Sequence, residues 1–401
     1  MHAKRLTSSL LFRIIVAILA GIVCSLFLPD WAARVFVTFN GLFGNFLGFF
    51  VPVLIFALIT PAIAGLGRGA GKWLGATVGI AYASTIISGF IAYAVAAAVY
   101  PTLLRAEALA EAVDIDEGAL QPYFAVEMPA PFEVMSALLL AFTIGIAMAA
   151  IGTPTLKSGA EELRQVIMKV IERFIIPLLP IYIFGIFLAM GMNGNLRLTL
   201  SMFLKVLLLA IGMTLVVLVL QYAAAGAIAR RNPLTAVRNM LPAYFTALGT
   251  SSSAATIPVT LRCARANGIA ENVAGFVIPL CATVHLSGSM MKIGLFAFAV
   301  LHMTTGGVSA GAAIGFVLLL GIMMVAAPGV PGGAIMAAVG LLQSQLGFDD
   351  GQVALMIAAY IAIDSFGTAC NVTGDGAIAL VINRFARGDV RGERLPADAT
   401  A

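Results

Sequence analysis

Six apolar runs, each close to the length of a membrane-spanning helix, constrain this chain more than any other feature. A helix needs roughly 20 predominantly apolar residues to cross about 30 Å of hydrocarbon. Of the 401 residues, 61% are hydrophobic and only 10% are charged, whereas a soluble domain carries about 25% charged residues. This composition excludes a cytosolic enzyme, a nucleic-acid binder and a disordered chain. We therefore expect an all-α polytopic membrane protein, with its clearest spans at residues 11–28, 42–64, 76–100, 135–151, 174–190 and 206–225.

Charge placement predicts the orientation of the chain in the bilayer. Lysine and arginine gather at residues 4–13, 157–173 and 230–238 and in the C-terminal tail, whereas the loops at 107–117 and 349–350 are acidic. Cytoplasmic loops carry an excess of lysine and arginine, so both termini are expected on the cytoplasmic side. The brief loops and short tails favour a bacterial inner membrane. The four cysteines are isolated from one another and predict neither a disulfide framework nor a zinc site.

Two later apolar stretches are interrupted near their middle by residues that break helices. Residues 238–262 contain the run GTSSS at 249–253, and residues 321–343 contain APGVPGG at 327–333. Non-helical backbone at membrane depth is tolerated only where protein buries it or a water-filled cavity meets it. Two such segments in corresponding places of two repeats are typical of the binding site of a secondary transporter. The alternative interpretation is two ordinary helices, each with a glycine kink.

A polar stripe runs along the last apolar segment, residues 353–381. At 100° per residue, Asp364, Thr368, Asn371 and Asp375 fall within about 60° of one another and extend about 16 Å along a helix. A carboxylate in the bilayer is costly, so such residues are usually functional and face the bundle interior. Oxygen ligands of this kind suit a hard cation such as Na⁺, together with a substrate ammonium group. The alternative is a structural ion pair, with Lys292 as the partner.

Four motifs resemble those of one family, the dicarboxylate/amino acid:cation symporters, which are the glutamate-transporter homologues. TSSSAATIPVT at 250–260 resembles the tip of the family's first re-entrant hairpin, and GVPGGA at 329–334 resembles the tip of its second. NVTGD at 371–375 is similar to its last-helix signature, and PLCAT at 279–283, followed by a break at 285–289, is similar to its seventh helix. The resemblance implies eight transmembrane helices plus two re-entrant helical hairpins, and a homotrimer.

The resemblance also implies a mobile transport domain that moves against a fixed scaffold. Residues 1–74 match scaffold spans 1 and 2, and residues 101–196 match scaffold spans 4 and 5 with a short acidic outer loop. Span 3 at 75–100 and residues 197–388 match the transport domain, which holds span 6, the first hairpin, span 7, the second hairpin and span 8. Residues 389–401 are expected to form a cytoplasmic tail.

Residue by residue, the resemblance implies a substrate site and cation sites. Asp364 matches the carboxylate that holds the α-amino group of the substrate, and Asp375 matches a ligand of one sodium ion. The substrate-site matches are Thr250, Ser251, Ser252 and Ser253 in the first tip, Gly329, Val330 and Pro331 in the second tip, and Asp364, Gly367, Thr368 and Asn371 in the last span. The metal-site matches are Asp375, Asn371, His285, Ser287, Tyr82 and Thr85.

Departures from the family pattern change what the resemblance implies. Gly367 stands where acidic-substrate members place an arginine for a second carboxylate, which favours a small neutral amino acid because Asp364 is kept. A C4-dicarboxylate or an acidic amino acid, coupled to H⁺ or Na⁺, is the alternative if Lys292 does the work of that arginine. His285 and Ser287 replace an amide and an aspartate of the cation sites, so one sodium site should be lost or weaker. One hypothesis is that His285 or Lys292 replaces a bound cation or takes part in proton coupling. The alternative is that His285 is a hydrogen-bonded core residue and that Lys292 is paired with a carboxylate.

Other classes of membrane protein fit these residues less well. An aspartyl protease needs two carboxylates that share a proton, whereas Asp364 and Asp375 lie three turns apart on one helix. The run GRGAGKW at 67–73 lacks the spacing of a phosphate-binding loop. An ion channel or an anion-leak pore is the remaining alternative class, but a pore does not need an amino-acid site at Asp364 and Thr368. We therefore expect a symporter rather than an enzyme, with membrane lipid and a small-molecule substrate as partners. It would couple a small neutral amino acid to Na⁺ by an elevator mechanism, with no organic cofactor and no nucleic acid.

Overall fold

The computed structural model describes residues 10–65, 72–104, 120–192, 196–327 and 331–386. Within these ranges the regular structure is helical throughout, without a strand. The elements are α2 (Leu10–Cys24), α3 (Asp30–Gly65), α4 (Lys72–Leu103), α6 (Val134–Ile151), α7 (Pro154–Val170), the π-helical turn η1 (Ile171–Ile175), α8 (Ile176–Met192), α9 (Leu196–Ala229), α10 (Pro233–Thr250), α11 (Ser253–Ala266), α12 (Glu271–Val284), α13 (Ser287–Thr305), α14 (Ala310–Ala326), α15 (Gly333–Leu346), α16 (Asp350–Ala362) and α17 (Asp364–Phe385).

Many of these helices are long and apolar enough to cross a bilayer. By length and composition, the described residues contain six such helices, and a seventh if the bent pair α16 and α17 is one span. α2 is apolar but has only 15 residues. The prediction of an all-α polytopic membrane protein is confirmed. The count of eight spans stays a prediction of the resemblance.

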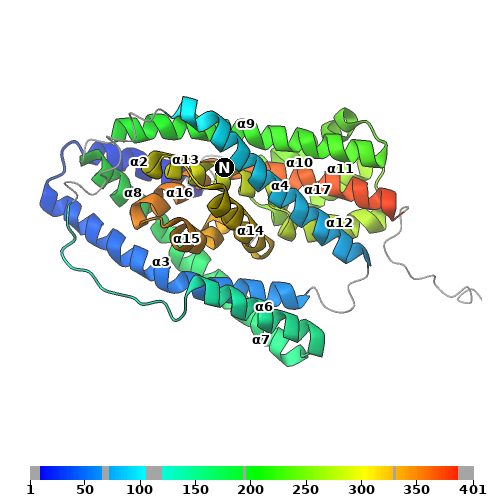
Figure 1. The fold of residues 1–401 in the computed structure, drawn as a ribbon, viewed down its shortest axis with the longest axis horizontal. Helices are drawn as coiled ribbons and strands as arrows, with labels where there is room; N and C mark the ends of the chain where they lie inside the picture. Colours follow the sequence, from blue (N-terminus) through cyan, green and yellow to red (C-terminus); the bar gives the residue numbers. More distant parts are fainter. Residues whose placement is uncertain (1–9, 66–71, 105–119, 193–195, 328–330, 387–401) are drawn as a thin grey trace, which may run out of the picture.

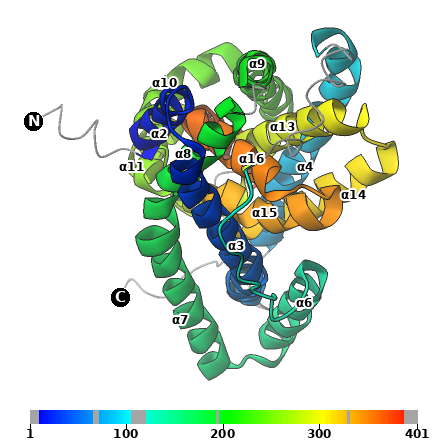
Figure 2. The same cartoon turned by 90° about the vertical axis from the view of Figure 1, so that its left-hand side faces the viewer.

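The helices form two sets that pack mainly within themselves. In one set α3 packs against α6 and α8, and α2 packs against α8. In the other set α17 packs against α9, α10, α12 and α13, and α4 packs against α13. Figure 1 shows α9 along the upper side of the molecule and α3 with α6 along the lower side, with α13, α15 and α16 between them. The view in Figure 2 also places α3, α6 and α7 on one side and α9 on another.

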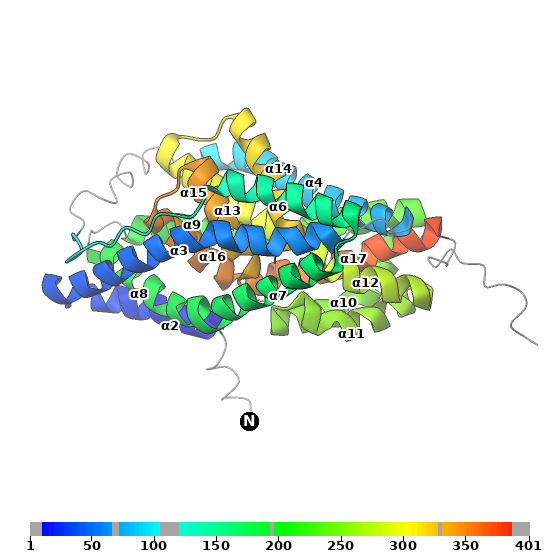
Figure 3. The same cartoon turned by 90° about the horizontal axis from the view of Figure 1, so that it is seen from below.

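Both interrupted stretches fold into helical hairpins. α10 and α11 pack against each other, as do α14 and α15, and Figure 3 shows α10 beside α11. At the first tip, Ser251 has a φ of 49° and its N–H donates to the carbonyl of Ala247. Such a residue in the left-handed helical conformation is common at the C-terminus of a helix. The Ser252 side chain then accepts from the N–H of Ala255 and caps α11. Two kinked but continuous helices are therefore excluded.

The last apolar segment, residues 353–381, is not one continuous helix. α16 ends at Ala362 and α17 begins at Asp364, with a bend of 60° between them. The Ile363 carbonyl at this bend accepts from the Nζ of Lys292 at 3.2 Å, so a side chain from α13 stabilises the break. The polar stripe is nevertheless intact, because all four of its residues lie on α17.

Candidate functional site

The polar stripe of α17 lies inside the helix bundle. Asp364, Thr368, Asn371 and Asp375 are between 1% and 6% exposed. Helices α9, α10, α12 and α13 all pack against α17. Buried charged and amide groups need hydrogen-bond partners. The partners of these four side chains therefore determine what the stripe can bind.

Asp364 lies where three helix ends meet. It is the first residue of α17, with only Ile363 between it and the end of α16, and its Oδ2 accepts from the backbone N–H of Gly332 at 2.8 Å. Gly332 precedes the first residue of α15, so this bond joins the carboxylate to the tip of the second hairpin. The unpaired N–H groups of helix N-termini favour negative charge. The Thr368 hydroxyl donates to the Asp364 carbonyl at 3.0 Å. Asp364 thus ties the second hairpin to the last helix.

Lys292 reaches the same junction from α13. Its Nζ lies 3.4 Å from Asp364 Oδ1, 3.2 Å from the Ile363 carbonyl oxygen and 3.9 Å from the centre of the Tyr360 ring. The lysine is fully buried. Gly367 leaves room for it, because a Cβ at that position would lie 2.5 Å from Nζ. The structure therefore contains an ion pair between Lys292 and Asp364, the alternative considered for the polar stripe.

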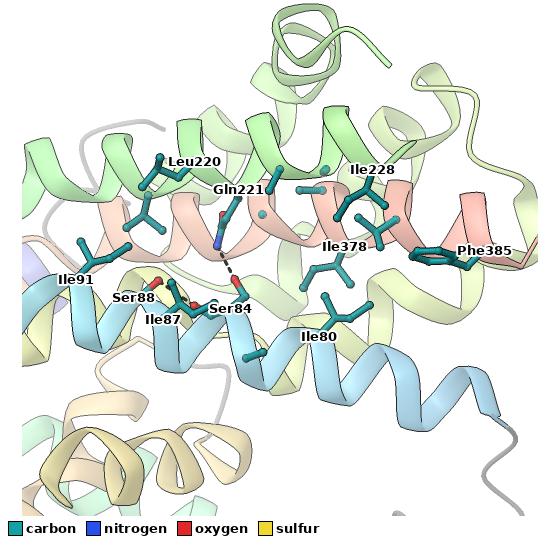
Figure 4. Close-up of a pocket in the computed structure, with 17 residues that line it drawn as sticks. Ile80, Ser84, Ile87, Ser88, Ile91, Leu220, Gln221, Ile228, Ile378 and Phe385 are labelled. Carbon is teal, nitrogen blue, oxygen red and sulfur yellow. Dashed lines mark hydrogen bonds between the residues drawn. The ribbon is translucent and has the colours of Figure 1, made fainter. Parts of the chain in front are cut away.

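Asp375 is paired with a histidine. His285 Nδ1 lies 2.9 Å from Asp375 Oδ1, and each side chain is at most 2% exposed. His285 Nε2 lies 3.1 Å from the Oγ of Ser84. The Gln221 amide donates to Ser84 Oγ at 2.9 Å and to Ser287 Oγ at 2.8 Å. Figure 4 shows Gln221 on α9 pointing across to Ser84 on α4, both among the lining residues of a largely apolar cavity of about 520 Å³.

Asn371 and Thr85 bind backbone N–H groups at the break between α12 and α13. Asn371 Oδ1 accepts from the N–H of Gly288 at 2.7 Å, and the Asn371 amide donates to Ser289 Oγ at 3.2 Å. Thr85 Oγ1 accepts from the N–H of Leu286 at 3.3 Å. The first N–H groups of a helix have no partner within it. Both side chains therefore cap the broken helix.

The remaining predicted residues lie at the hairpin tips and on α4. Gly329 and Val330 lie outside the described residues, and Pro331 is in the turn before α15. At the first tip, the two hydroxyl oxygens of Thr250 and Thr256 lie 3.3 Å apart. Tyr82 packs close to the position of Gly321 on α14. The binding roles predicted for Thr250, Ser251, Ser252, Ser253, Pro331 and Tyr82 stay predictions.

Three residues of this cluster were not predicted from the sequence. Gln221 is the single amide in the apolar run 206–225, and polar residues in membrane spans are usually functional, so this signal was available. Ser84 carries no comparable signal, because serine often bonds to its own helix backbone. The hydroxyl oxygen of Tyr360 lies 2.9 Å from Ser289 Oγ, a contact that only packing between distant helices creates.

Several of the candidate sodium ligands already have nitrogen donors of the protein as partners. A hard cation needs oxygen atoms with free lone pairs. Four candidate oxygens instead face protein nitrogen donors at 2.7 to 3.3 Å: Asp375 Oδ1, Ser287 Oγ, Asn371 Oδ1 and Thr85 Oγ1. Among the residues that the structure describes, no three histidine, cysteine, aspartate or glutamate side chains gather in a way that could hold a metal.

Comparisons with known proteins identify similar chains. A family model described as the sodium:dicarboxylate symporter family matches residues 10–385. Excitatory amino acid transporter 1 of Homo sapiens is 30% identical over 165 residues, which are 41% of this chain and 30% of that protein. Excitatory amino acid transporter 5 of Homo sapiens is 31% identical over 163 residues (40% and 29%), and an excitatory amino acid transporter of Caenorhabditis elegans is 28% identical over 162 residues (40% and 32%). Each match spans less than a third of the relative's length.

Proposed function

Because the chain belongs to the sodium:dicarboxylate symporter family, a family of transporters rather than enzymes, we propose that it carries a small, neutral amino acid across a membrane together with a cation. Sodium is the coupling ion that the family description names. The names of the relatives, excitatory amino acid transporters, support an amino acid as the substrate. We further propose a homotrimer in a bacterial inner membrane, with both termini on the cytoplasmic side.

The observation that carries the proposal is the position of Asp364. A carboxylate offers about four lone-pair sites, and Asp364 uses one for the N–H of Gly332. Lys292 Nζ, at 3.4 Å, is farther away than the roughly 2.7–2.9 Å of a short charge-assisted bond. An α-ammonium group can therefore still bind this carboxylate. A substrate bound there would contact both the second hairpin and the last helix, so closing the hairpin tip would enclose it.

Replacing Asp364 by asparagine tests the proposal. The amide keeps an acceptor for the N–H of Gly332 but loses the charge that the substrate ammonium needs. Hydrogen bonds to charged groups contribute about 1.5–3 kcal/mol, so the affinity for L-alanine and L-serine should fall roughly 10- to 150-fold. Ligand-dependent thermal stabilisation of the purified protein in detergent measures that affinity. Undiminished amino-acid uptake by D364N in proteoliposomes would contradict the proposal.

A C4-dicarboxylate is the second candidate substrate, and Lys292 favours it. Gly367 stands where the family resemblance places an arginine, and the Lys292 ammonium lies in the space that a side chain at Gly367 would enter. The positive charge is thus supplied from α13 instead of α17. A lysine binds carboxylates as a point charge, without the planar fork of an arginine. The family description also names dicarboxylates.

One ligand screen separates the two candidates. Succinate and fumarate are compared with L-alanine and L-serine on the wild type, on Lys292→Met and on D364N. An amino-acid carrier should be stabilised by the amino acids and lose that response in D364N. A dicarboxylate carrier should respond to succinate or fumarate and lose the response in K292M, compared on K292M protein that still unfolds in one cooperative transition in detergent.

We also propose an elevator mechanism in which residues 75–100 and 197–388 move against residues 1–74 and 101–196. The packing of the two helix sets supports this division. The contact between them includes Gly340 on α15, which packs against Val51 on α3 and Val134 on α6. Glycine gives this contact a flat surface over which two bodies can slide.

A further inference from the structure

Three oxygen atoms in this cluster, Asp375 Oδ1, Ser84 Oγ and Ser287 Oγ, already face nitrogen atoms of the protein. A carboxylate can only accept, so its bond with His285 assigns a hydrogen to Nδ1. The other ring nitrogen faces Ser84, whose Oγ also accepts from Gln221. The second hydrogen of the same amide is donated to Ser287. An ion that displaced the imidazole from Asp375 Oδ1 would leave the buried ring N–H without its partner, which is costly.

The His285 ring also fills the space beside the carboxylate. His285 and Asp375 are each 1% exposed. Gly374, the residue before Asp375, has no room for a side chain: a Cβ there would lie 2.7 Å from His285 Cε1 and 2.5 Å from Gln221 Oε1. The ring and the amide are therefore packed directly against the backbone of α17. Side chains packed this closely leave little free space, so an ion at Asp375 Oδ1 would have to displace the ring.

We propose that His285 takes the place of a bound cation at Asp375, so that this position takes up no sodium. The ring N–H pairs with Oδ1 of the buried carboxylate, where an ion could otherwise bind. It follows that any coupling sodium binds elsewhere, and that His285 is a positioning residue for α17 and for the break before α13. The inference rests on the proposed function only where it concerns the coupling of transport to sodium. Whether sodium binds at Asp375 can be measured without any substrate.

Equilibrium binding of ²²Na⁺ to the purified full-length protein in detergent tests the proposal, with choline replacing sodium at constant ionic strength. In Asp375→Asn the side-chain oxygen can still accept from His285, so the cluster should fold, and its sodium binding should equal that of the wild type. The double variant H285N/S287D restores the oxygen ligands that the family resemblance implies. It should bind about one more sodium ion per chain, as expected for one restored oxygen site. His302→Asn, which changes a histidine on α13 outside the cluster, is the control and should bind as the wild type does.

Two results would overturn the proposal. One is a loss of bound sodium in D375N, which would mean that the carboxylate holds an ion in the wild type. The other is unchanged sodium binding in H285N/S287D when that protein elutes and melts as the wild type does. Should the double variant fail to fold, D375N alone still decides between the two outcomes. A failed amino-acid or dicarboxylate screen would leave this measurement unaffected, because no substrate is present.

Discussion

At the scale of single residues, Lys292 serves several acceptors at once. Its ammonium group lies near the Asp364 carboxylate, the carbonyls of Ile363 and Asp364, and the ring of Tyr360. The carbonyls at the end of a helix carry partial negative charge and the N–H groups at the start of the next carry partial positive charge. The Lys292 ammonium, which reaches the end of α16 from α13, and the Asp364 carboxylate at the start of α17 therefore stabilise the same break from its two sides.

Removing the lysine alone should be strongly destabilising. Lys292→Met keeps most of the volume but leaves the Asp364 charge unpaired inside the bundle, which costs about 3–5 kcal/mol of unfolding free energy. The double variant K292M/D364N should recover part of the loss, because a neutral amide tolerates burial better than a lone carboxylate. Thermal unfolding of the single and double variants in detergent gives the coupling energy. Strictly additive losses would show that the two side chains do not interact.

Which residues share a helix face could be predicted from the sequence, but which residues pair could not. Helical periodicity is a local property, so it placed Asp364, Thr368, Asn371 and Asp375 on one buried face. The pair of His285 with Asp375 joins residues 90 positions apart and depends on how α12 and α17 pack. For Lys292 the sequence left both a coupling role and an ion pair open.

At the scale of elements, the broken helices need α13 to approach α17 closely. Gly288 lies at this contact: a Cβ there would be 2.5 Å from the carbonyl oxygen of Gly367 and 2.7 Å from the Cβ of Cys370. The oxygen belongs to helix backbone, which cannot turn aside as a side chain can. The close approach brings the N–H of Gly288 within reach of Asn371.

Gly288→Ala should therefore separate the two helices. Overpacking a dense interior costs about 1–3 kcal/mol. Gly275→Ala on α12 is the matched control, because no atom lies within 4 Å of its Cβ position and alanine in a helix gains up to about 1 kcal/mol over glycine. Unfolding temperatures in detergent should fall for G288A and stay level or rise for G275A. Equal effects of the two substitutions would argue against a close contact at Gly288.

The helix breaks differ in how readily the sequence reveals them. The two hairpin turns contain glycine, serine or proline at the break itself, and these residues act locally. The bend at Ile363 lies in a stretch, residues 360–366, without glycine or proline. Its carbonyl is satisfied by Lys292 from another helix. A break that depends on a distant side chain leaves no local signal.

At the scale of the whole molecule, the proposed movement predicts that a covalent link between the two helix sets stops transport. Val51 on α3 and Gly340 on α15 are in direct contact, so the double variant V51C/G340C should form a disulfide under mild oxidation. Uptake in proteoliposomes should fall to background and return on reduction. V51C and G340C alone are the controls, and each should transport equally under oxidising and reducing conditions. Full transport by the oxidised, crosslinked protein would contradict an elevator in which these sets slide past each other.

The shared space of Gly367 and Lys292 also limits the order in which these two residues can be replaced over time. An arginine at 367 has no room while the lysine is present, and a chain that loses the lysine first carries an unpaired Asp364. Each single step is harmful, although the two steps together exchange one positive charge for another. In related sequences, Gly367 and Lys292 are therefore expected to be kept together or replaced together, because a chain with only one of the two changes is destabilised.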